Sequence, residues 1–222
     1  MMSTAKIQNE RLTECTYDSY IRGESPLVLT RIYDERYNLA VWNRVLSSSL
    51  VDALDRDLKQ GVQVKLVEAV SVDDVREIIG DKLEQFSASD ELVQHIYELV
   101  EMFSLLFDLK RVGLRLRTTD SALCPRFHVD KVGCRLVTAF VGAGTEWLEN
   151  RYVNRSLLGK PSITESDLFS GSSCSINNID TGHVALLKGE QWEGNEGNGI
   201  VHRSPTVKPE QRRLLMTLDI ID

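Results

Sequence analysis

The feature that most constrains the fold of this chain is a change of hydrophobic period near Arg111. Before this position, apolar residues three or four positions apart form one face of a long predicted helix: Leu92, Ile96, Val100, Phe103 and Phe107. From Val112 to Arg117, apolar residues instead alternate with glycine and arginine, which is the pattern of a strand with one buried face. Because helices come first and strands follow, we expect an α+β protein whose helices pack on one face of a β-sandwich or barrel.

Turn and capping residues delimit the other predicted elements. Two further helices are expected over residues 50–60, ending at Gly61, and 72–86, with Ser71 as the cap. Strands are expected at 27–29, 62–70, 126–129, 135–141, 175–179, 183–187, 200–203 and 213–221. These elements divide the chain into a flexible tail (1–25), a helical supporting region (26–110) and a β-rich core (111–222), which together form one compact domain.

Composition excludes several classes of partner. The 222 residues include 33 acidic and 26 basic ones, giving a net charge of −7, so we expect no nucleic-acid or anionic membrane partner. No stretch approaches the ~20 apolar residues of a membrane span, and the first residues lack the apolar run of a signal peptide. The four scattered cysteines contain no Cys-x-x-Cys pair, so we expect free thiols in a cytoplasmic protein. The expected substrate is a small molecule or a protein. The sequence is also compatible with a homodimer.

A candidate metal site begins with His128 and Asp130, two residues apart in an expected strand. Side chains with this spacing point to the same side, so an imidazole and a carboxylate converge. Such a pair arises by chance in a chain of this composition, but His202, 72 residues after Asp130 on another short apolar segment, adds a second imidazole. Two histidines and one carboxylate form a facial triad, which leaves neighbouring positions open on Fe(II) for a co-substrate and oxygen.

Two arginines follow the second histidine. Arg212 and Arg213 stand ten and eleven residues after His202, at the start of the last expected strand. A buried arginine there is suited to bidentate binding of a carboxylate. Arg212 shares its strand face with apolar residues, whereas the face of Arg213 also carries Thr217 and Asp219. We therefore assign carboxylate binding to Arg213, with Arg212 as the alternative.

These three elements, a His-x-Asp pair, a distal histidine and an arginine about ten residues later, resemble the Fe(II)/2-oxoglutarate-dependent dioxygenase superfamily. The resemblance covers roughly residues 111–222 and implies a double-stranded β-helix, that is, a jelly-roll or cupin-like barrel. It further implies that His128, Asp130 and His202 bind Fe(II) and that the metal chelates 2-oxoglutarate. Arg213 would hold the far carboxylate, with a hydrogen bond from Thr217. The implied reaction is hydroxylation or demethylation of an unknown substrate.

A narrower resemblance comes from the segments Phe127-His128-Val129-Asp130, His202-Arg203-Ser204-Pro205 and Leu218-Asp219. They are similar to an uncharacterised bacterial family of unknown function, which supplies no substrate. One departure concerns the arginine, because many members of the superfamily have a serine two residues after it and this chain has Leu215. The motifs thus support the metal more directly than the co-substrate.

Three other interpretations use the same residues. Cys124, His128, Asp130 and Cys134 share a face if their strand is continuous and would then suit zinc, although residues 131–133 have the composition of a turn. A cupin-like barrel that binds a metal without 2-oxoglutarate would have the same ligands and no carboxylate-binding arginine. In the third interpretation, His128 and His202 bind no metal and belong to a protein-interaction domain.

Four further residues are candidates for contact with the substrate. Arg126 is separated from His128 and Asp130 by even numbers of residues, so it is expected on the same side of the strand. Arg115 and Arg117 lie on the polar side of their own strand. Each of the three is able to bind an anionic group. Trp147 is expected to line the entrance, as an amphipathic aromatic residue. A solvated surface or ordinary packing is the alternative for these four side chains.

Overall fold

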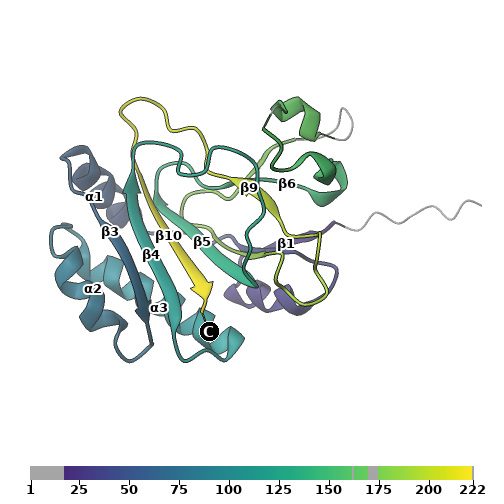
Figure 1. Ribbon diagram of the computed structural model, residues 1–222. Helices are drawn as coiled ribbons and strands as arrows, with labels where there is room; N and C mark the ends of the chain where they lie inside the picture. The colour runs from purple at the N-terminus through teal and green to yellow at the C-terminus, as the bar shows by residue number, and fades with distance from the viewer. Residues whose placement is uncertain (1–17, 162, 170–174, 222) are drawn as a thin grey trace, which may run out of the picture.

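Two β-sheets dominate the fold (Figure 1). The structure, a computed structural model, describes residues 18–161, 163–169 and 175–221. Within these ranges, the larger sheet has seven strands in the order β1 (Tyr20–Gly23), β2 (Leu39–Trp42), β8 (Val184–Lys188), β5 (Cys134–Val141), β10 (Arg213–Ile220), β4 (Val112–Thr119) and β3 (Lys65–Val70). The smaller sheet has the order β7 (Asn177–Asn178), β6 (Glu146–Leu148) and β9 (Val201–Arg203). Neighbouring strands are antiparallel, except for β1 and β2, which are parallel.

The main helices are α1 (Ser48–Lys59), α2 (Val75–Leu83) and α3 (Ser89–Phe107). The side chain of Ser47 caps α1 by accepting a hydrogen bond from the Leu50 N–H at 3.2 Å. Four short 3₁₀ helices lie in the described connections: η1 (Pro26–Tyr33), η2 (Asn150–Tyr152), η3 (Arg155–Leu157) and η4 (Glu165–Leu168). The mixed helix and strand content predicted from the hydrophobic periods is confirmed.

Alternation along the strands separates two layers of core. The even-numbered residues of β10, such as Leu214 and Met216, pack with apolar residues of α2 and α3. On the opposite face of the same sheet, Val137 and Leu187 pack with Trp147 of the smaller sheet. The helices therefore cover one face of the larger sheet, and the smaller sheet lies over the other face. The candidate site lies between the two sheets.

The N-terminal half supplies more of the sheet than its sequence pattern indicates. Besides β3, which lies within the expected strand 62–70, strands β1 and β2 precede residue 111, and Tyr20–Gly23 of β1 falls in the expected tail. Each of β1 and β2 has four residues, too few for a clear alternation, and β2 is an apolar run buried on both faces. Residues 1–17 of the expected tail lie outside the described part of the chain.

Two expected strands take other conformations. Residues 27–29 belong to η1, because Pro26 begins this helix with a suitable φ and Ser25 Oγ accepts a hydrogen bond from the Leu27 N–H at 3.3 Å. Residues 126–129 form a single β-bridge, through His128, rather than a strand. None of the described helices combines the length and apolar character needed to cross a membrane.

Candidate metal centre

His128 lies in the connection between β4 and β5 and pairs with His202 of β9. The pairing consists of two backbone hydrogen bonds of 3.0 Å, one in each direction, so the loop extends the edge of the smaller sheet. Residues directly opposite each other in such a pair have neighbouring side chains. The two imidazole rings consequently lie with their centroids 4.6 Å apart.

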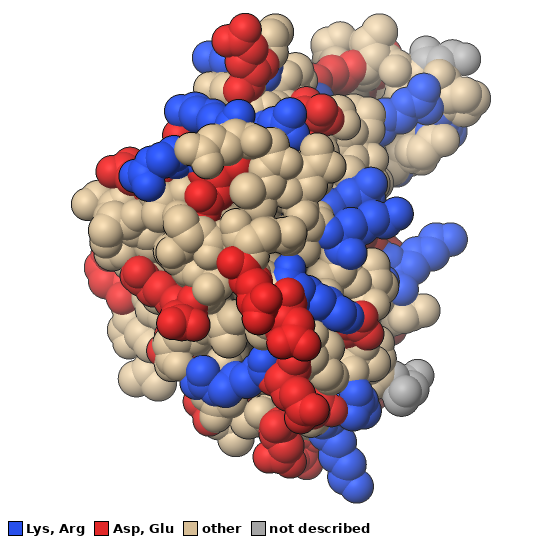
Figure 2. Space-filling model, turned by 90° about the vertical axis from the view of Figure 1, so that its left-hand side faces the viewer, with Lys and Arg blue, Asp and Glu red and all other residues tan. Residues whose placement is uncertain are grey.

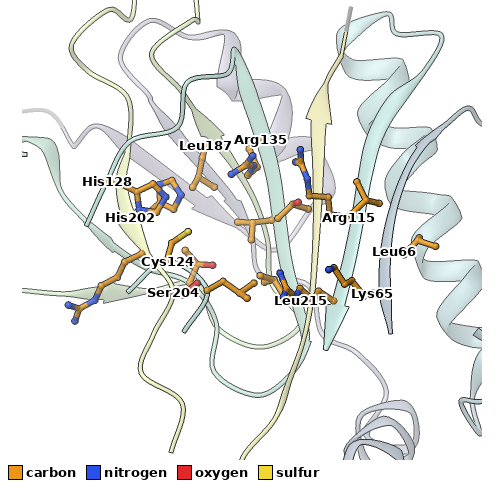
Figure 3. A pocket seen from close by; sticks show the side chains of 17 residues that line it. Lys65, Leu66, Arg115, Cys124, His128, Arg135, Leu187, His202, Ser204 and Leu215 are labelled. Atoms are coloured by element: carbon orange, nitrogen blue, oxygen red, sulfur yellow. The ribbon is translucent and has the colours of Figure 1, made fainter. Parts of the chain in front are cut away.

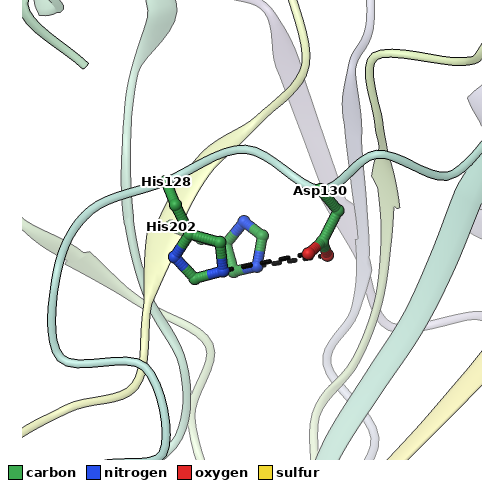
Figure 4. Close-up of side chains that lie close together, drawn as sticks. All are labelled: His128, Asp130 and His202. Carbon is green, nitrogen blue, oxygen red and sulfur yellow. Dashed lines mark ion pairs between the residues drawn. The ribbon is translucent and has the colours of Figure 1, made fainter. Parts of the chain in front are cut away.

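Asp130 completes the cluster (Figure 4). Its carboxylate lies 3.3 Å from Nε2 of His202 and 3.8 Å from Nε2 of His128. Ligand atoms of the three side chains all lie within 4.8 Å of one another. The structure thus brings together the three residues that the sequence predicts as metal ligands.

Backbone carbonyl groups orient both imidazole rings. Nδ1 of His128 lies 2.9 Å from the carbonyl oxygen of Arg126, and Nδ1 of His202 lies 3.0 Å from that of Ile200. A carbonyl oxygen only accepts, so each Nδ1 carries the hydrogen, and in a neutral imidazole Nε2 then presents a lone pair. Two lone pairs facing a carboxylate require a cation or a proton between them. The donor set therefore fits a divalent metal ion.

Burial and neighbouring charges set the protonation of these groups. Burial lowers the pKa of His128, and the charge of His202 lowers it further, which favours the neutral imidazole that a metal needs. Burial of Asp130 opposes ionisation, but a hydrogen bond and positive charge from His202, when a proton occupies Nε2 in place of a metal ion, and the charge of Arg135 bring the pKa of the Asp130 carboxyl to about 2. Asp130 is therefore ionised at neutral pH.

The guanidinium of Arg135 binds the same carboxylate oxygen that faces His202. Nη1 of Arg135 donates to Oδ2 of Asp130 at 2.8 Å, while Nε and Nη2 donate to Asp219 at 2.6 and 3.1 Å. Arg115 also donates to Asp219. Asp130, Arg135, Asp219 and Arg115 thus form a continuous chain of charged hydrogen bonds behind the candidate ligands. Sequence reasoning missed the roles of Arg135 and Asp219. The only sequence signal for Asp219 was its position on the more polar face of β10.

A cavity of about 380 Å³ opens beside the cluster (Figure 3). His128 and His202 line one side of it, and Lys65 and Arg115 lie on the other side in the view of Figure 3. Its floor is the face of the larger sheet turned away from the helices, with apolar contributions from Val137, Leu187 and Leu215. The predicted ligands therefore face a space large enough for a small organic molecule.

Arg213 is buried with 1% of its surface exposed. Its Nε donates to the Ala143 carbonyl oxygen at 2.5 Å, but Nη1 and Nη2 have no hydrogen-bond partner among the described residues. Burial lowers the pKa of Arg213 to about 10, although Glu146 opposes this shift. Arg213 itself does not line the cavity; Thr145, two residues after Ala143, does. The buried guanidinium, outside the cavity wall, therefore lacks a full set of acceptors among the described residues.

The other arginine and the threonine of the predicted anchor are placed differently. Arg212 is half-buried and lies outside the cavity wall. Thr217 lines the cavity but is four residues from Arg213 on β10, which corresponds to about 13 Å of strand. The expected hydrogen bond from Thr217 to the carboxylate held by Arg213 does not fit this separation, and we assign Thr217 to the cavity wall instead.

The predicted substrate residues divide into three groups. Arg115 and Arg117 line the cavity. Arg126 is exposed and lines a neighbouring pocket of about 230 Å³ instead. Trp147 is fully buried between the sheets, with its ring centroid 4.9 Å from that of Tyr20, so the expectation that it lines the entrance is wrong.

The cysteines do not support a zinc site. Cys134 is fully buried in the core between the larger sheet and the helices, on the face away from Asp130, and burial raises the pKa of its thiol. Cys124 lines the cavity, but the cluster of possible ligands found among the described residues contains only the two histidines and the aspartate. The turn at residues 131–133 breaks the strand parity on which the zinc interpretation depends.

Comparison with known proteins identifies one family and several similar solved structures. The model of a family described as "Protein of unknown function (DUF1826)" matches residues 23–219. No curated protein matches the chain. Among solved structures, the chain is similar to a Pseudomonas putida prolyl-4-hydroxylase, with 10% identity over 86% of this chain and 95% of that chain and a TM-score of 0.45.

Two plant enzymes give comparable values. The dioxygenase for auxin oxidation 1 from Arabidopsis thaliana, in a complex with 2-oxoglutarate, has 13% identity over 92% of each chain and a TM-score of 0.46. The rice dioxygenase for auxin oxidation has 11% identity over 92% of this chain and 83% of that chain, also with a TM-score of 0.46. At these identities, the chemistry has to be inferred from the residues of the site itself.

Proposed function

The chain belongs to the family of proteins of unknown function DUF1826, and we propose that it is a non-haem Fe(II)- and 2-oxoglutarate-dependent oxygenase, a hydroxylase or demethylase with a double-stranded β-helix core. In this proposal His128, Asp130 and His202 hold the metal and Arg213 holds the co-substrate. The observation that carries it is the convergence of two Nε2 lone pairs and one ionised carboxylate at the cavity.

Three ligands of this kind favour a catalytic metal over a structural one. A structural zinc site is usually closed by four ligands, mostly thiolates, and the described cluster has three ligands without sulfur. Two imidazoles and a carboxylate leave adjacent coordination positions open, which is the arrangement used with Fe(II) in oxygenases. His128 keeps 33% of its side chain exposed, so the metal position is accessible from the cavity.

The unsatisfied guanidinium supports a dicarboxylate co-substrate. A buried arginine with two unpartnered nitrogens is costly unless an anion binds it, and a carboxylate matches its two parallel donors. A molecule with one carboxylate at Arg213 and a second oxygen donor pair at the metal satisfies both groups, as 2-oxoglutarate would. When bound, Fe(II) and 2-oxoglutarate would supply the electrons that activate oxygen for attack on a substrate C–H bond.

The protein contributes position and exclusion of water. Backbone carbonyls fix the two imidazole rings, and Arg135 fixes the carboxylate of Asp130. Apolar side chains of the cavity floor, Val137, Leu187 and Leu215, exclude water from the space in which a substrate C–H bond would lie. Arg213 orients the co-substrate by its far carboxylate.

The test is an anaerobic titration of the metal-free protein with Fe(II), with and without 2-oxoglutarate. We expect a weak visible charge-transfer band only when both are present. His202→Ala should abolish it, and His183→Gln, at a histidine outside the cluster, should retain it. Arg213→Met should lose the band at moderate 2-oxoglutarate concentrations, whereas Arg212→Met should retain it. One tightly bound zinc with no response to 2-oxoglutarate would contradict the proposal.

A further inference from the structure

The wall of the metal cavity carries charge of one sign. Five cationic side chains line it, and no aspartate or glutamate does among the described residues: Lys65, Arg115, Arg117, Arg135 and Arg203. The whole chain, by contrast, has a net charge of −7. On the side of the molecule shown in Figure 2, acidic and basic side chains are interspersed. The cationic lining is therefore a local feature of the cavity rather than a consequence of composition.

Three of these cations already have carboxylate partners. Arg203 donates to Glu146 and Glu165, each at 2.5 Å. Arg135 bridges Asp130 and Asp219, and Arg115 shares Asp219. Their charges are thus balanced within the protein, and they serve to hold the cavity wall and the metal ligand in place.

Lys65 and Arg117 differ from the other three. Neither side chain has a hydrogen bond or an ion pair with any described residue. They lie directly opposite each other in the antiparallel pair of β3 and β4, on the face that forms the cavity floor. Like charges in this position repel each other, because opposite side chains of a pair have Cβ atoms about 5 Å apart. An anion bound between them would remove this repulsion.

The surroundings of the pair indicate the kind of anion. Leu215 lies directly opposite Arg117 in the next strand, and Val137 and Leu187 continue the apolar floor toward the histidines. A ligand that fits this wall has an anionic group at Lys65 and Arg117 and an apolar part directed toward the metal cluster. A cavity of about 380 Å³ suits a small molecule. The net negative charge of the chain disfavours a long polyanion such as nucleic acid.

We infer that the substrate of the proposed oxygenase is a small organic anion, whose carboxylate or phosphate group binds Lys65 and Arg117 while its apolar part lies over Leu215 and Val137. This inference rests on the proposed function. It gives the two anionic ligands separate sites, because the proposed function places the far carboxylate of the co-substrate at Arg213, which lies outside the cavity wall. It also assigns a role to Lys65, which sequence reasoning did not single out.

The test uses the full-length protein with Fe(II) and saturating 2-oxoglutarate under anaerobic conditions. Hexanoate, hexyl phosphate and neutral 1-hexanol serve as probes with the same apolar part, and binding is measured by calorimetric titration. We expect one or both anions to bind more tightly than hexanol, and the stronger of the two identifies the group. The double variant Lys65→Gln/Arg117→Gln should lose about tenfold or more of this affinity, since two charge-assisted hydrogen bonds are removed.

Arg56→Gln is the matched control, because it removes an exposed positive charge from α1, outside the cavity wall. It should bind both anions as the wild type does. The inference is overturned if anions and hexanol bind alike, or not at all, or if the double variant retains the wild-type affinity. It is also overturned if the double variant loses the charge-transfer band, because the pair would then hold the co-substrate. Anion binding that depends on the pair in a protein without any band would overturn only the proposed function.

Discussion

At the scale of single residues, Asp130 is the most constrained of the three candidate ligands. The Arg135 guanidinium donates to it at 2.8 Å and is itself fixed by two hydrogen bonds to Asp219. Only 5% of the Asp219 side chain is exposed, so this support is shielded from water. The orientation of the carboxylate toward the histidines therefore depends on residues that do not touch the metal position.

Arg135→Gln tests this dependence. We expect Fe(II) to bind about 10–100-fold more weakly, because groups that orient metal ligands typically contribute this much affinity. Arg115→Gln is the control, since Arg115 contacts Asp219 but not Asp130, and it should bind Fe(II) nearly as the wild type does. The measurement is anaerobic titration with a competing chelator. Equal losses in the two variants would show that Arg135 acts only through the general charge of the cavity.

Arg213 allows a prediction about stability that is independent of catalysis. Two nitrogens of this buried guanidinium lack partners, so Arg213→Met removes an unfavourable group and loses one hydrogen bond to Ala143. We expect the free energy of unfolding of the cofactor-free protein to stay the same or rise by up to about 2 kcal/mol. Addition of 2-oxoglutarate with Fe(II) should raise the free energy of unfolding of the wild type, and the added 2-oxoglutarate should have no such effect on the variant.

Urea unfolding in the presence and absence of 2-oxoglutarate provides the measurement, with Arg212→Met as the control for loss of a neighbouring charge. A loss of more than about 2 kcal/mol in cofactor-free Arg213→Met would mean that the guanidinium is already satisfied in the folded protein.

At the scale of elements, the turn after β5 is built around glycine. A Cβ atom at Gly144 would lie 1.5 Å from the carbonyl oxygen of Ile179, and Gly142 has a φ of +79°. The first contact is with backbone and leaves no room for a side chain. This close approach lets the segment that follows β5 carry the Ala143 carbonyl to Arg213 and Thr145 to the cavity wall.

Gly144→Ala should accordingly destabilise the protein by more than about 2 kcal/mol, because the backbone of the turn must move. Gly80→Ala is the matched control: a Cβ at this position in α2 meets nothing within 4 Å, and the substitution should stabilise by about 0.5–1 kcal/mol. Denaturant unfolding followed by circular dichroism measures both. Similar stability of the two variants would contradict the tight approach at Gly144.

The longer strands were predictable from the sequence, as alternating or continuous apolar runs, whereas β1 and β2 were not. The expected strands at 135–141, 183–187 and 213–221 lie within one residue of β5, β8 and β10 at each end. Four-residue strands such as β1 give too short a pattern, and their pairing depends on partners far away in the sequence. The two-residue spacing of His128 and Asp130 correctly predicted that these side chains converge, and His202 joins them as predicted.

Contacts across strands explain what sequence reasoning missed at the site. Arg135 reaches Asp219 because of the register of β5 with β10, and Lys65 faces Arg117 because of the register of β3 with β4. A single sequence does not contain this register. Strand parity does not extend to Cys134, as the turn composition of residues 131–133 indicated, and the Cys134 side chain enters the opposite core. The metal ligation, the role of Arg213 and the substrate contacts remain predictions for experiment.

At the scale of the whole molecule, the candidate ligands connect parts that are distant along the chain. His128 and Asp130 come from the loop before β5 of the larger sheet, whereas His202 belongs to β9 of the smaller sheet. A bound cation would therefore join the two sheets at the cavity. Because unfolding separates these ligands, metal binding should be linked to global stability.

We expect Fe(II) at about 100 times its dissociation constant to raise the free energy of unfolding by about 2.7 kcal/mol, or the melting temperature by roughly 5–10 °C for a chain of this size. Anaerobic differential scanning fluorimetry with Fe(II), and again after addition of a chelator, measures the change. His202→Ala should show no shift, while His183→Gln should respond as the wild type does. A shift that persists in His202→Ala would place the metal elsewhere, because the loss of one of three ligands at this cluster should remove the linkage between the two sheets.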